Sequence, residues 1–87
     1  MNYVYILYSE KLKKYYVGRS SDLKKRMIMH NNGSVPFTSR GVPWELVYYA
    51  AFINKSDAVV EEKFLKTGKG RDRRKYLLKH FIESRES

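Results

Sequence analysis

Cysteine does not occur in this chain. Its absence excludes a disulfide scaffold, zinc–thiolate sites and cysteine nucleophiles. Long apolar runs are missing as well, since no stretch approaches the ~20 residues that a membrane-spanning helix needs. The N-terminus also lacks the charged and then apolar order of a signal peptide. We therefore expect a cytoplasmic protein with no membrane partner.

Acidic residues are scarce relative to basic ones. The chain carries 9 Asp and Glu against 18 Lys and Arg, which gives a formal net charge of +9. Such an excess is expected of a protein that meets a polyanion, and nucleic acid is the commonest polyanion inside a cell. The length of 87 residues predicts a single domain, residues 1–87, with one modest core. Charge alone indicates a class of partner and no chemistry.

Three segments have the composition of strands. Residues 3–7 and 15–18 are dense in Tyr, Val and Ile, and the polar connection between them is too short for a crossover helix, so we predict an antiparallel hairpin. The period of two puts Tyr5 on one face of the first strand, and Val4 and Ile6 on the other. Residues 44–53 are the most strand-like run, and they are predicted to be the third and most buried strand.

Three helices are predicted from capping residues and apolar spacing. They cover residues 23–30 behind Asp22, residues 58–67 ending at Gly68, and residues 76–83 with Asp72 as a candidate N-cap. The order is therefore strand, strand, helix, strand, helix, helix, which predicts a layered α/β domain.

Two segments are predicted to lack regular structure, and a third, residues 68–75, leads into the last predicted helix. Residues 31–43 are predicted to form a loop, and a solvated basic linker is the alternative to phosphate contact at residues 68–75. The last four residues have no apolar anchor, so we expect them to fray.

Two polar positions on the predicted helices have more than one interpretation. Arg26 and His30 border the apolar face of the first helix, and spacing alone favours an arginine that extends over the core edge and a histidine at the surface. Glu62 adjoins apolar positions of the second helix. It either pairs with Lys66, an interaction worth roughly 0.3–0.5 kcal/mol, or it serves a site.

An ordered set of residues resembles the GIY-YIG nuclease superfamily, most closely its short stand-alone members. The set comprises Tyr3-Val4-Tyr5, Tyr16-Val17-Gly18-Arg19-Ser20, Asp22-Leu23, Arg26, His30, Asn31-x-Gly33, and Ala58, Glu62, Leu65 and Lys66. Tyr3 stands where the family often has glycine. The resemblance implies an α/β sandwich of the α+β class, in which helices flank a central three-stranded antiparallel sheet.

The resemblance also implies a divalent-metal-dependent DNA endonuclease. Mg²⁺ or Mn²⁺ would be held by Glu62, and Arg26 would stabilise charge on the phosphoryl oxygens. Tyr5 or Tyr16 would activate the water or position the phosphate, and the residues leave open which of them does so. His30 would shuttle a proton or contact phosphate. A tyrosine with an ordinary pKa near 10 is a poor base at neutral pH, so this role requires the arginine or the metal to lower its pKa.

Basic side chains around these positions are expected to contact DNA phosphates. They are Arg19, Lys25, Arg40, Lys66, Lys69, Arg71, Arg73 and Arg74. Residues 73–75 are predicted to form a cationic first turn of the third helix, where an anion would offset the helix dipole. Thr38 and Ser39 are further candidates for phosphate contacts.

The expected partner is DNA, including branched or damaged forms, with no small-molecule cofactor. Because we expect a single domain, with no second one to recognise sequence, a protein partner would have to supply site specificity. Many family members carry an asparagine beyond the glutamate helix, and no Asn follows Asn54 here. Two alternatives stay open: a non-catalytic basic nucleic-acid-binding module with the same fold, and a small basic protein associated with ribosomes.

Overall fold

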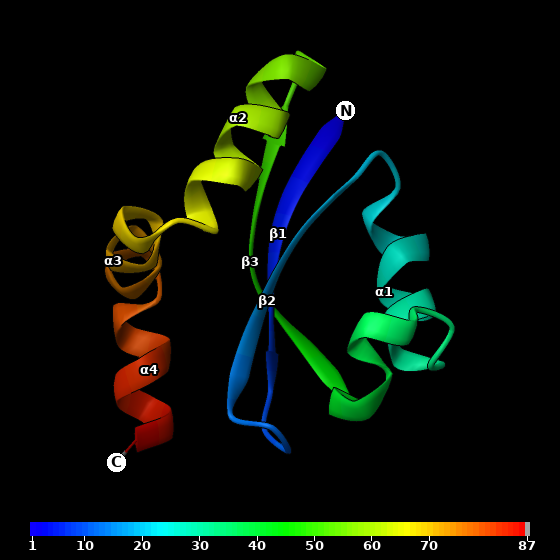
Figure 1. Cartoon of the computed structure of the whole chain (residues 1–87), viewed down its shortest axis with the longest axis vertical. Helices are drawn as coiled ribbons and strands as arrows, with labels where there is room; N and C mark the ends of the chain where they lie inside the picture. Colours follow the sequence, from blue (N-terminus) through cyan, green and yellow to red (C-terminus); the bar gives the residue numbers. More distant parts are fainter. Residues whose placement is uncertain (87) are drawn as a thin grey trace.

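The computed structural model describes residues 1–86. Three strands, β1 (Asn2–Ser9), β2 (Lys14–Ser20) and β3 (Trp44–Phe52), form one antiparallel sheet in the order β2-β1-β3 (Figure 1). β1 is thus the central strand, and it is the most buried of the three. The prediction that residues 44–53 form the most buried strand is wrong, because β3 lies at an edge of the sheet.

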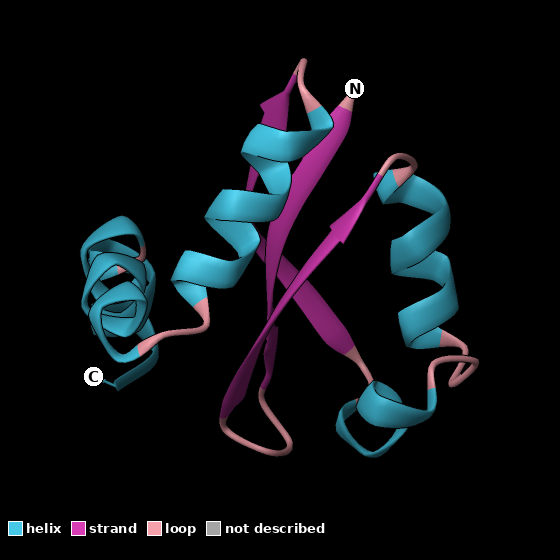
Figure 2. Cartoon of the chain, turned by 45° about the horizontal axis from the view of Figure 1, so that its top comes forward, coloured by secondary structure: helices cyan, strands magenta, loops and turns pink. Residues whose placement is uncertain are grey.

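Helices flank the sheet on different sides (Figure 2). Val4 and Ile6 join one buried cluster with residues of α2, α3 and α4, whereas Tyr5 and Leu7 join a second cluster with residues of α1. The predicted alternation along the first strand is therefore confirmed. The predicted fold class, a three-stranded antiparallel sheet flanked by helices, is confirmed as well.

The first helix, α1 (Leu23–Asn31), begins as predicted. The Asp22 side chain accepts a hydrogen bond from the Lys25 backbone N–H at 3.0 Å. The helix is followed by Gly33, which has a φ of +79°. Part of the predicted loop is regular, since Pro36–Gly41 form a 3₁₀ helix, η1. Short i→i+3 hydrogen bonds and a proline at its start explain this helix. The prediction of a loop took the glycines and prolines as breakers of all regular structure, and a 3₁₀ helix tolerates them.

The second half of the chain contains α2 (Lys55–Leu65), α3 (Gly68–Leu77) and α4 (Lys79–Glu86). The predicted order is confirmed, but the third helix begins earlier than predicted, at Gly68 and not after Asp72. Thr67, not Asp72, caps α3 by accepting a hydrogen bond from the Gly70 N–H at 3.1 Å. A Cβ at Gly70 would lie 1.8 Å from the Phe64 carbonyl oxygen, so this glycine allows α3 to pass close to α2.

The C-terminal helix is anchored to the hairpin and to β3. Arg85 pairs with Glu10 at 3.5 Å and with Glu45, and its guanidinium lies 4.9 Å from the ring centroid of Phe81. The predicted fraying is therefore wrong for Arg85, whereas Ser87 lies outside the described residues. Within the described part of the chain, none of the helices has the length and apolar character needed to cross a membrane.

Candidate active site

Gly18 makes room for the phenol of Tyr5. The two residues are paired across β1 and β2. A Cβ built at Gly18 would lie 2.5 Å from both Cζ and Oη of Tyr5, which is closer than any real Cβ contact. The glycine of the Tyr-x-Gly motif is thus required because the Tyr5 side chain crosses the backbone of β2 at this point.

Gly18→Ala should therefore lower the free energy of unfolding by about 1–3 kcal/mol, the usual cost of overpacking. Gly68→Ala is the matched control, because a Cβ there meets nothing within 4 Å. Denaturant unfolding of both variants measures the difference. A change within about 0.5 kcal/mol for Gly18→Ala, the range of an ordinary surface substitution, would show that Tyr5 does not need this clearance.

A buried hydrogen-bond chain joins the central strand to α1 and η1. The Tyr5 hydroxyl lies 2.8 Å from Nε2 of His30, and Nδ1 of His30 lies 2.8 Å from Oγ1 of Thr38. All three side chains are almost fully buried. The surface position favoured for His30 by spacing is therefore wrong, and Thr38 is too deep to contact a phosphate as predicted.

The hydrogen bonds that join Tyr5, His30 and Thr38 favour one tautomer of His30. The Thr38 hydroxyl donates to the Val35 carbonyl at 3.4 Å, which leaves its oxygen to accept from Nδ1–H of His30. Nε2 of His30 is then the acceptor that faces the Tyr5 hydroxyl. The arrangement provides a path for a proton from Tyr5 to His30.

The pKa values of Tyr5 and His30 shift in opposite directions. Burial raises the pKa of Tyr5, and this effect exceeds the lowering by hydrogen bonding from Arg26. Burial, followed by repulsion from Arg26, lowers the pKa of His30. In the free protein Tyr5 is a neutral phenol and His30 a neutral imidazole at neutral pH. The role of Tyr5 as a base was predicted to require a lowered pKa. In the free protein the pKa of Tyr5 is raised instead.

Stability should decrease as the pH falls below about 6.5, the ordinary histidine pKa. Unfolded His30 gains a proton there while the buried residue, with its lowered pKa, stays neutral, so the unfolded state binds more protons. The contribution of neutral His30 to stability is complete above the unfolded-state pKa. It is lost as the pH falls from there through the lowered pKa of the folded state. Denaturant unfolding should show a pH slope that His30→Gln reduces. His80, which is 93% exposed, is present in both proteins, and equal slopes would contradict the burial of neutral His30.

Glu62 lies beside the edge strand β2, among positive side chains. This cluster comprises Glu62, Arg19, Arg26 and Lys66. The Glu62 carboxylate is 3.4 Å from Nε of Arg19 and 3.2 Å from Nζ of Lys66, and the side chain is 20% exposed. Two nearby charges act on the pKa of Tyr5 in opposite directions: the negative charge of Glu62 raises it, and the positive charge of Arg26 lowers it. The pair with Lys66 suggested by helix spacing is present, while the contact with Arg19 is additional. One carboxylate and three cations give this cluster a net charge of +2.

Two arginine atoms of this cluster are buried donors without an acceptor. Nε of Arg19 and Nε of Arg26 make no hydrogen bond to any part of the chain that the structure describes. The 3.4 Å approach of Arg19 to Glu62 is an ion pair whose geometry does not satisfy a hydrogen bond. Buried donors normally have partners, so these two atoms are left free to donate to an acceptor from outside the chain.

The neighbouring Glu61 points elsewhere. It pairs with Arg73 of α3 at 3.6 Å and is 18% exposed, almost the same as Glu62. Burial therefore does not separate the two glutamates, whereas their partners do. Glu62 faces the arginine cluster beside Tyr5, and Glu61 ties α2 to α3.

Aromatic rings support the buried chain from one side. The Tyr16 ring is half-buried, and its centroid lies 5.2 Å from that of His30 and 6.3 Å from that of Trp44. The Trp44 indole donates to the Thr38 carbonyl at 2.7 Å and so holds η1 against the site. Thr38 and Trp44 were not assigned these roles from the sequence, and only the tertiary contacts reveal them.

The remaining predicted DNA contacts are dispersed over the surface. Lys25, Arg40 and Lys69 are exposed and lie on α1, η1 and α3. Arg73 is paired with Glu61. The prediction of a cationic first helical turn at residues 73–75 is wrong, because these residues belong to the second half of α3, where positive charge agrees with the helix dipole.

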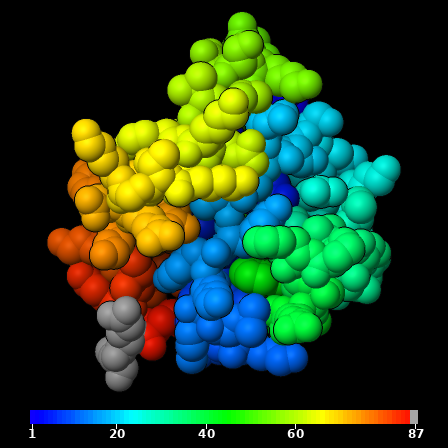
Figure 3. All heavy atoms as spheres, viewed as in Figure 1, coloured from blue at the N-terminus to red at the C-terminus, as the bar shows by residue number. Residues whose placement is uncertain are grey.

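The space-filling view shows that part of the edge strand β2 lies at the surface. β2, in light blue, is visible between α2 in yellow-green and η1 in green (Figure 3). Since the β-strand pairing leaves β2 at an edge of the sheet, a ligand can approach the strand on this face.

A family model described as a GIY-YIG catalytic domain matches residues 1–83. The chain belongs to the GIY-YIG family. Family membership supports endonuclease activity and implies a nucleic-acid substrate. The ordered tyrosine, glycine, arginine, histidine and glutamate positions of this chain thus lie within a matched nuclease domain.

Relatives of this GIY-YIG chain are small bacterial proteins. A UPF0213 protein of Clostridium perfringens is 43% identical over 67 residues, which cover 76% of this chain and 71% of that protein. One from Streptococcus pyogenes is 34% identical over 95% of this chain and 91% of its own length. The solution NMR structure of a UPF0213 protein from Bacillus halodurans has a TM-score of 0.55 at 31% identity, over 88% of this chain and 85% of that one.

The donor set at Glu62 suits a metal ion that is shared with the substrate. Over the described residues, no group of three or more His, Asp or Glu side chains gathers to hold an ion by itself. Mg²⁺ keeps several waters and is commonly bound by one or two carboxylates together with substrate phosphates. A single carboxylate beside Arg19 and Lys66 fits this mode of binding.

Proposed function

We propose that this protein is a divalent-metal-dependent DNA endonuclease whose active site contains Tyr5, Tyr16, Arg26, His30 and Glu62. The observation that carries the proposal is the pair of buried arginine Nε–H groups without acceptors, that of Arg19 beside Glu62 and that of Arg26 near Tyr5. A phosphodiester supplies oxygen acceptors and negative charge for a cluster of net charge +2. The family match supplies the reaction class.

Substrate binding begins with the arginines. The scissile phosphate accepts hydrogen bonds from Arg26 and Arg19, which partly releases Glu62 from its ion pair with Arg19. Tyr5 has no exposed surface in the free protein, and Arg26 lies close enough to its hydroxyl to lower the pKa of the phenol in part. Movement of Arg26 onto the phosphate therefore gives the attacking water access to Tyr5.

The proton of the water then passes along the buried chain. As the water oxygen forms its bond to phosphorus, its proton moves to Oη of Tyr5 while the phenol proton moves to Nε2 of His30. The bond from phosphorus to the leaving sugar oxygen breaks, and that oxygen takes a proton from solvent. His30 can accept the proton because its lowered pKa keeps it neutral, and Thr38 holds its other nitrogen. Tyr16, half-buried beside His30, positions the phosphate.

Glu62 would hold Mg²⁺ or Mn²⁺ together with phosphate oxygens and waters. The ion supplies Lewis-acid stabilisation of the phosphoryl charge and lowers the pKa of a bound water. Lys66, paired with Glu62 at 3.2 Å, keeps the carboxylate oriented along α2.

Substrate selection is proposed to be structural or weakly sequence-specific. The remaining cations, among them Lys25, Arg40 and Lys69, are exposed side chains suited to contacts with the phosphate backbone, which carry little sequence information. Branched or damaged DNA is the proposed substrate, and a protein partner would add any site specificity.

An activity screen tests this function against that of a binding module. Labelled branched, nicked, single-stranded and duplex DNA are incubated with the protein and Mg²⁺ or Mn²⁺, and binding is followed in parallel by gel shift. We expect cleaved product from at least one substrate. Shifted DNA with no product under any of these conditions would favour the non-catalytic alternative.

A further inference from the structure

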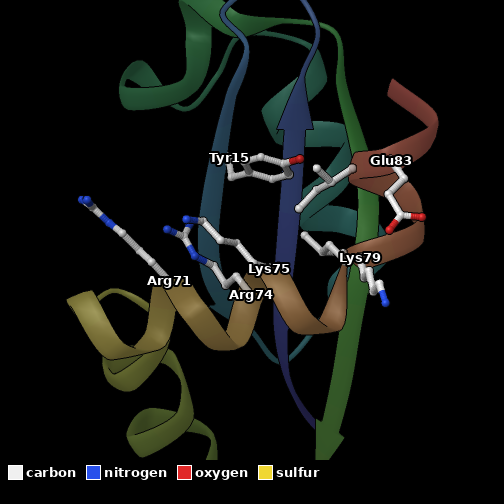
Figure 4. Close-up of a pocket in the computed structure, with 8 residues that line it drawn as sticks. Tyr15, Arg71, Arg74, Lys75, Lys79 and Glu83 are labelled. Carbon is white, nitrogen blue, oxygen red and sulfur yellow. The ribbon is translucent and has the colours of Figure 1, made fainter. Parts of the chain in front are cut away.

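A second basic surface lies next to the start of β2. It is a groove of about 520 Å³ between β2, α3 and α4, called the α3–α4 groove here (Figure 4). Four cations and one carboxylate line it, together with a tyrosine: Arg71, Arg74, Lys75, Lys79, Glu83 and Tyr15. Their formal charge sums to +3, and Leu78 and Ile82 provide an apolar floor.

Arg74 is the member of this groove that lacks a partner. Its Nε is buried and makes no hydrogen bond to any described residue. Burial, and then repulsion from Arg71, lowers the pKa of its guanidinium. Two neighbouring arginines and an unused buried donor are arranged as they would be around an anion that is not part of this chain.

β2 connects the groove with the candidate active site. Tyr15, Val17 and Arg19 lie on one face of this strand, because side chains alternate along it. Four residues at about 3.3 Å each separate Tyr15 from Arg19 by ~13 Å. That distance corresponds to about four nucleotide steps at an axial rise of 3.4 Å. A nucleic-acid strand bound beside Arg19 can therefore reach the groove within a few nucleotides.

We propose that the α3–α4 groove is a second phosphate-binding site, in which Arg74 and Arg71 hold a non-scissile phosphate of the substrate strand. The proposal rests on the proposed function, since it takes the scissile phosphate to lie at Arg19 and Arg26. The sugar next to the held phosphate lies on Leu78 and Ile82. Contact at both ends of β2 fixes the path of the strand relative to the cutting site.

Nucleic acid fits the groove better than an acidic segment of a partner protein. The groove and the active-site cluster share one strand, and both contain a buried arginine Nε without an acceptor. A continuous polyanion such as a phosphodiester backbone satisfies both with one molecule.

Salt-dependent binding in chelator tests the groove without cleavage. The dissociation constant of a labelled oligonucleotide is measured by fluorescence anisotropy for the parent protein, Arg74→Gln and Lys55→Gln. Lys55 is an exposed cation at the start of α2, so this control makes the same change in net charge. We expect Arg74→Gln to reduce the slope of log affinity against log salt by about 0.9, or about 0.7 for a single strand, while Lys55→Gln leaves it unchanged.

Arg71→Gln, at an exposed position, repeats the test if Arg74→Gln alters the fold. Unchanged slopes for both variants overturn the proposal and leave the groove to solvent or to a protein partner. A reduced slope in a protein that never cleaves would instead support the groove and reject the nuclease function.

Discussion

Glu62→Gln should lower the rate of DNA cleavage on the order of 10³-fold or more, because metal-ion stabilisation is worth several kcal/mol. The amide keeps the size and most hydrogen bonds of the carboxylate but cannot supply its negative charge to the ion. DNA binding should persist or tighten, since the repulsion between carboxylate and phosphate is removed. Single-turnover cleavage at saturating DNA, with anisotropy for binding, measures both quantities.

Glu61→Gln is the matched control for this variant. It makes the same chemical change one residue away, on the same helix and at nearly the same exposure, but it affects an ion pair with Arg73. Its cleavage rate should stay close to that of the parent. Equal losses for both variants, or an inactive Glu61→Gln alone, would show that the assignment of Glu62 to the metal is wrong.

Tyr5→Phe should slow cleavage by at least about 10²-fold, the usual contribution of a general acid–base group. The ring still fills its place beneath Gly18, but the hydroxyl that joins the water to His30 is lost. Nε2 of His30 also loses its partner, which should cost about 1–3 kcal/mol of stability. Thermal unfolding with single-turnover cleavage below the melting range separates these two effects.

Thr38→Val provides a second readout of the same proton path. It keeps the shape of the side chain but removes the acceptor that holds Nδ1 of His30, so the pH dependence of the cleavage rate should shift. Tyr5→Phe should remove the contribution of His30 to that dependence. Rates within about a factor of two of the parent for Tyr5→Phe would leave the tyrosine as a packing residue, because acid–base groups contribute far more.

The strand faces could be predicted from the sequence because alternation is local. Val4 and Ile6 oppose Tyr5 whatever the neighbouring strands are. The central position of β1 could not be predicted, since residues 44–53 have equally strong strand composition and only long-range pairing places them at the edge. Similarly, α3 depends on the close passage of Gly70 over α2, so Gly68, which was predicted only to end the second helix, begins the third.

The candidate site was predictable in its residue types and not in its connections. Tyr5 and His30 are 25 residues apart, and no local pattern shows that they share a buried hydrogen bond. The spacing of α2 suggested Lys66 as a partner of Glu62, but Arg19 comes from a different element. The acceptorless arginine atoms depend on packing around each guanidinium, which sequence periodicity does not describe.

Metal dependence of cleavage is the measurement that tests the nuclease assignment most directly. Single-turnover cleavage of one labelled DNA is followed with the parent protein in Mg²⁺, in Mn²⁺ and in excess chelator, and Glu62→Gln is run alongside in each. The account predicts cleavage by the parent in either metal, none in chelator, recovery when metal is restored, and little with Glu62→Gln throughout. Undiminished cleavage by the parent in excess chelator would contradict it.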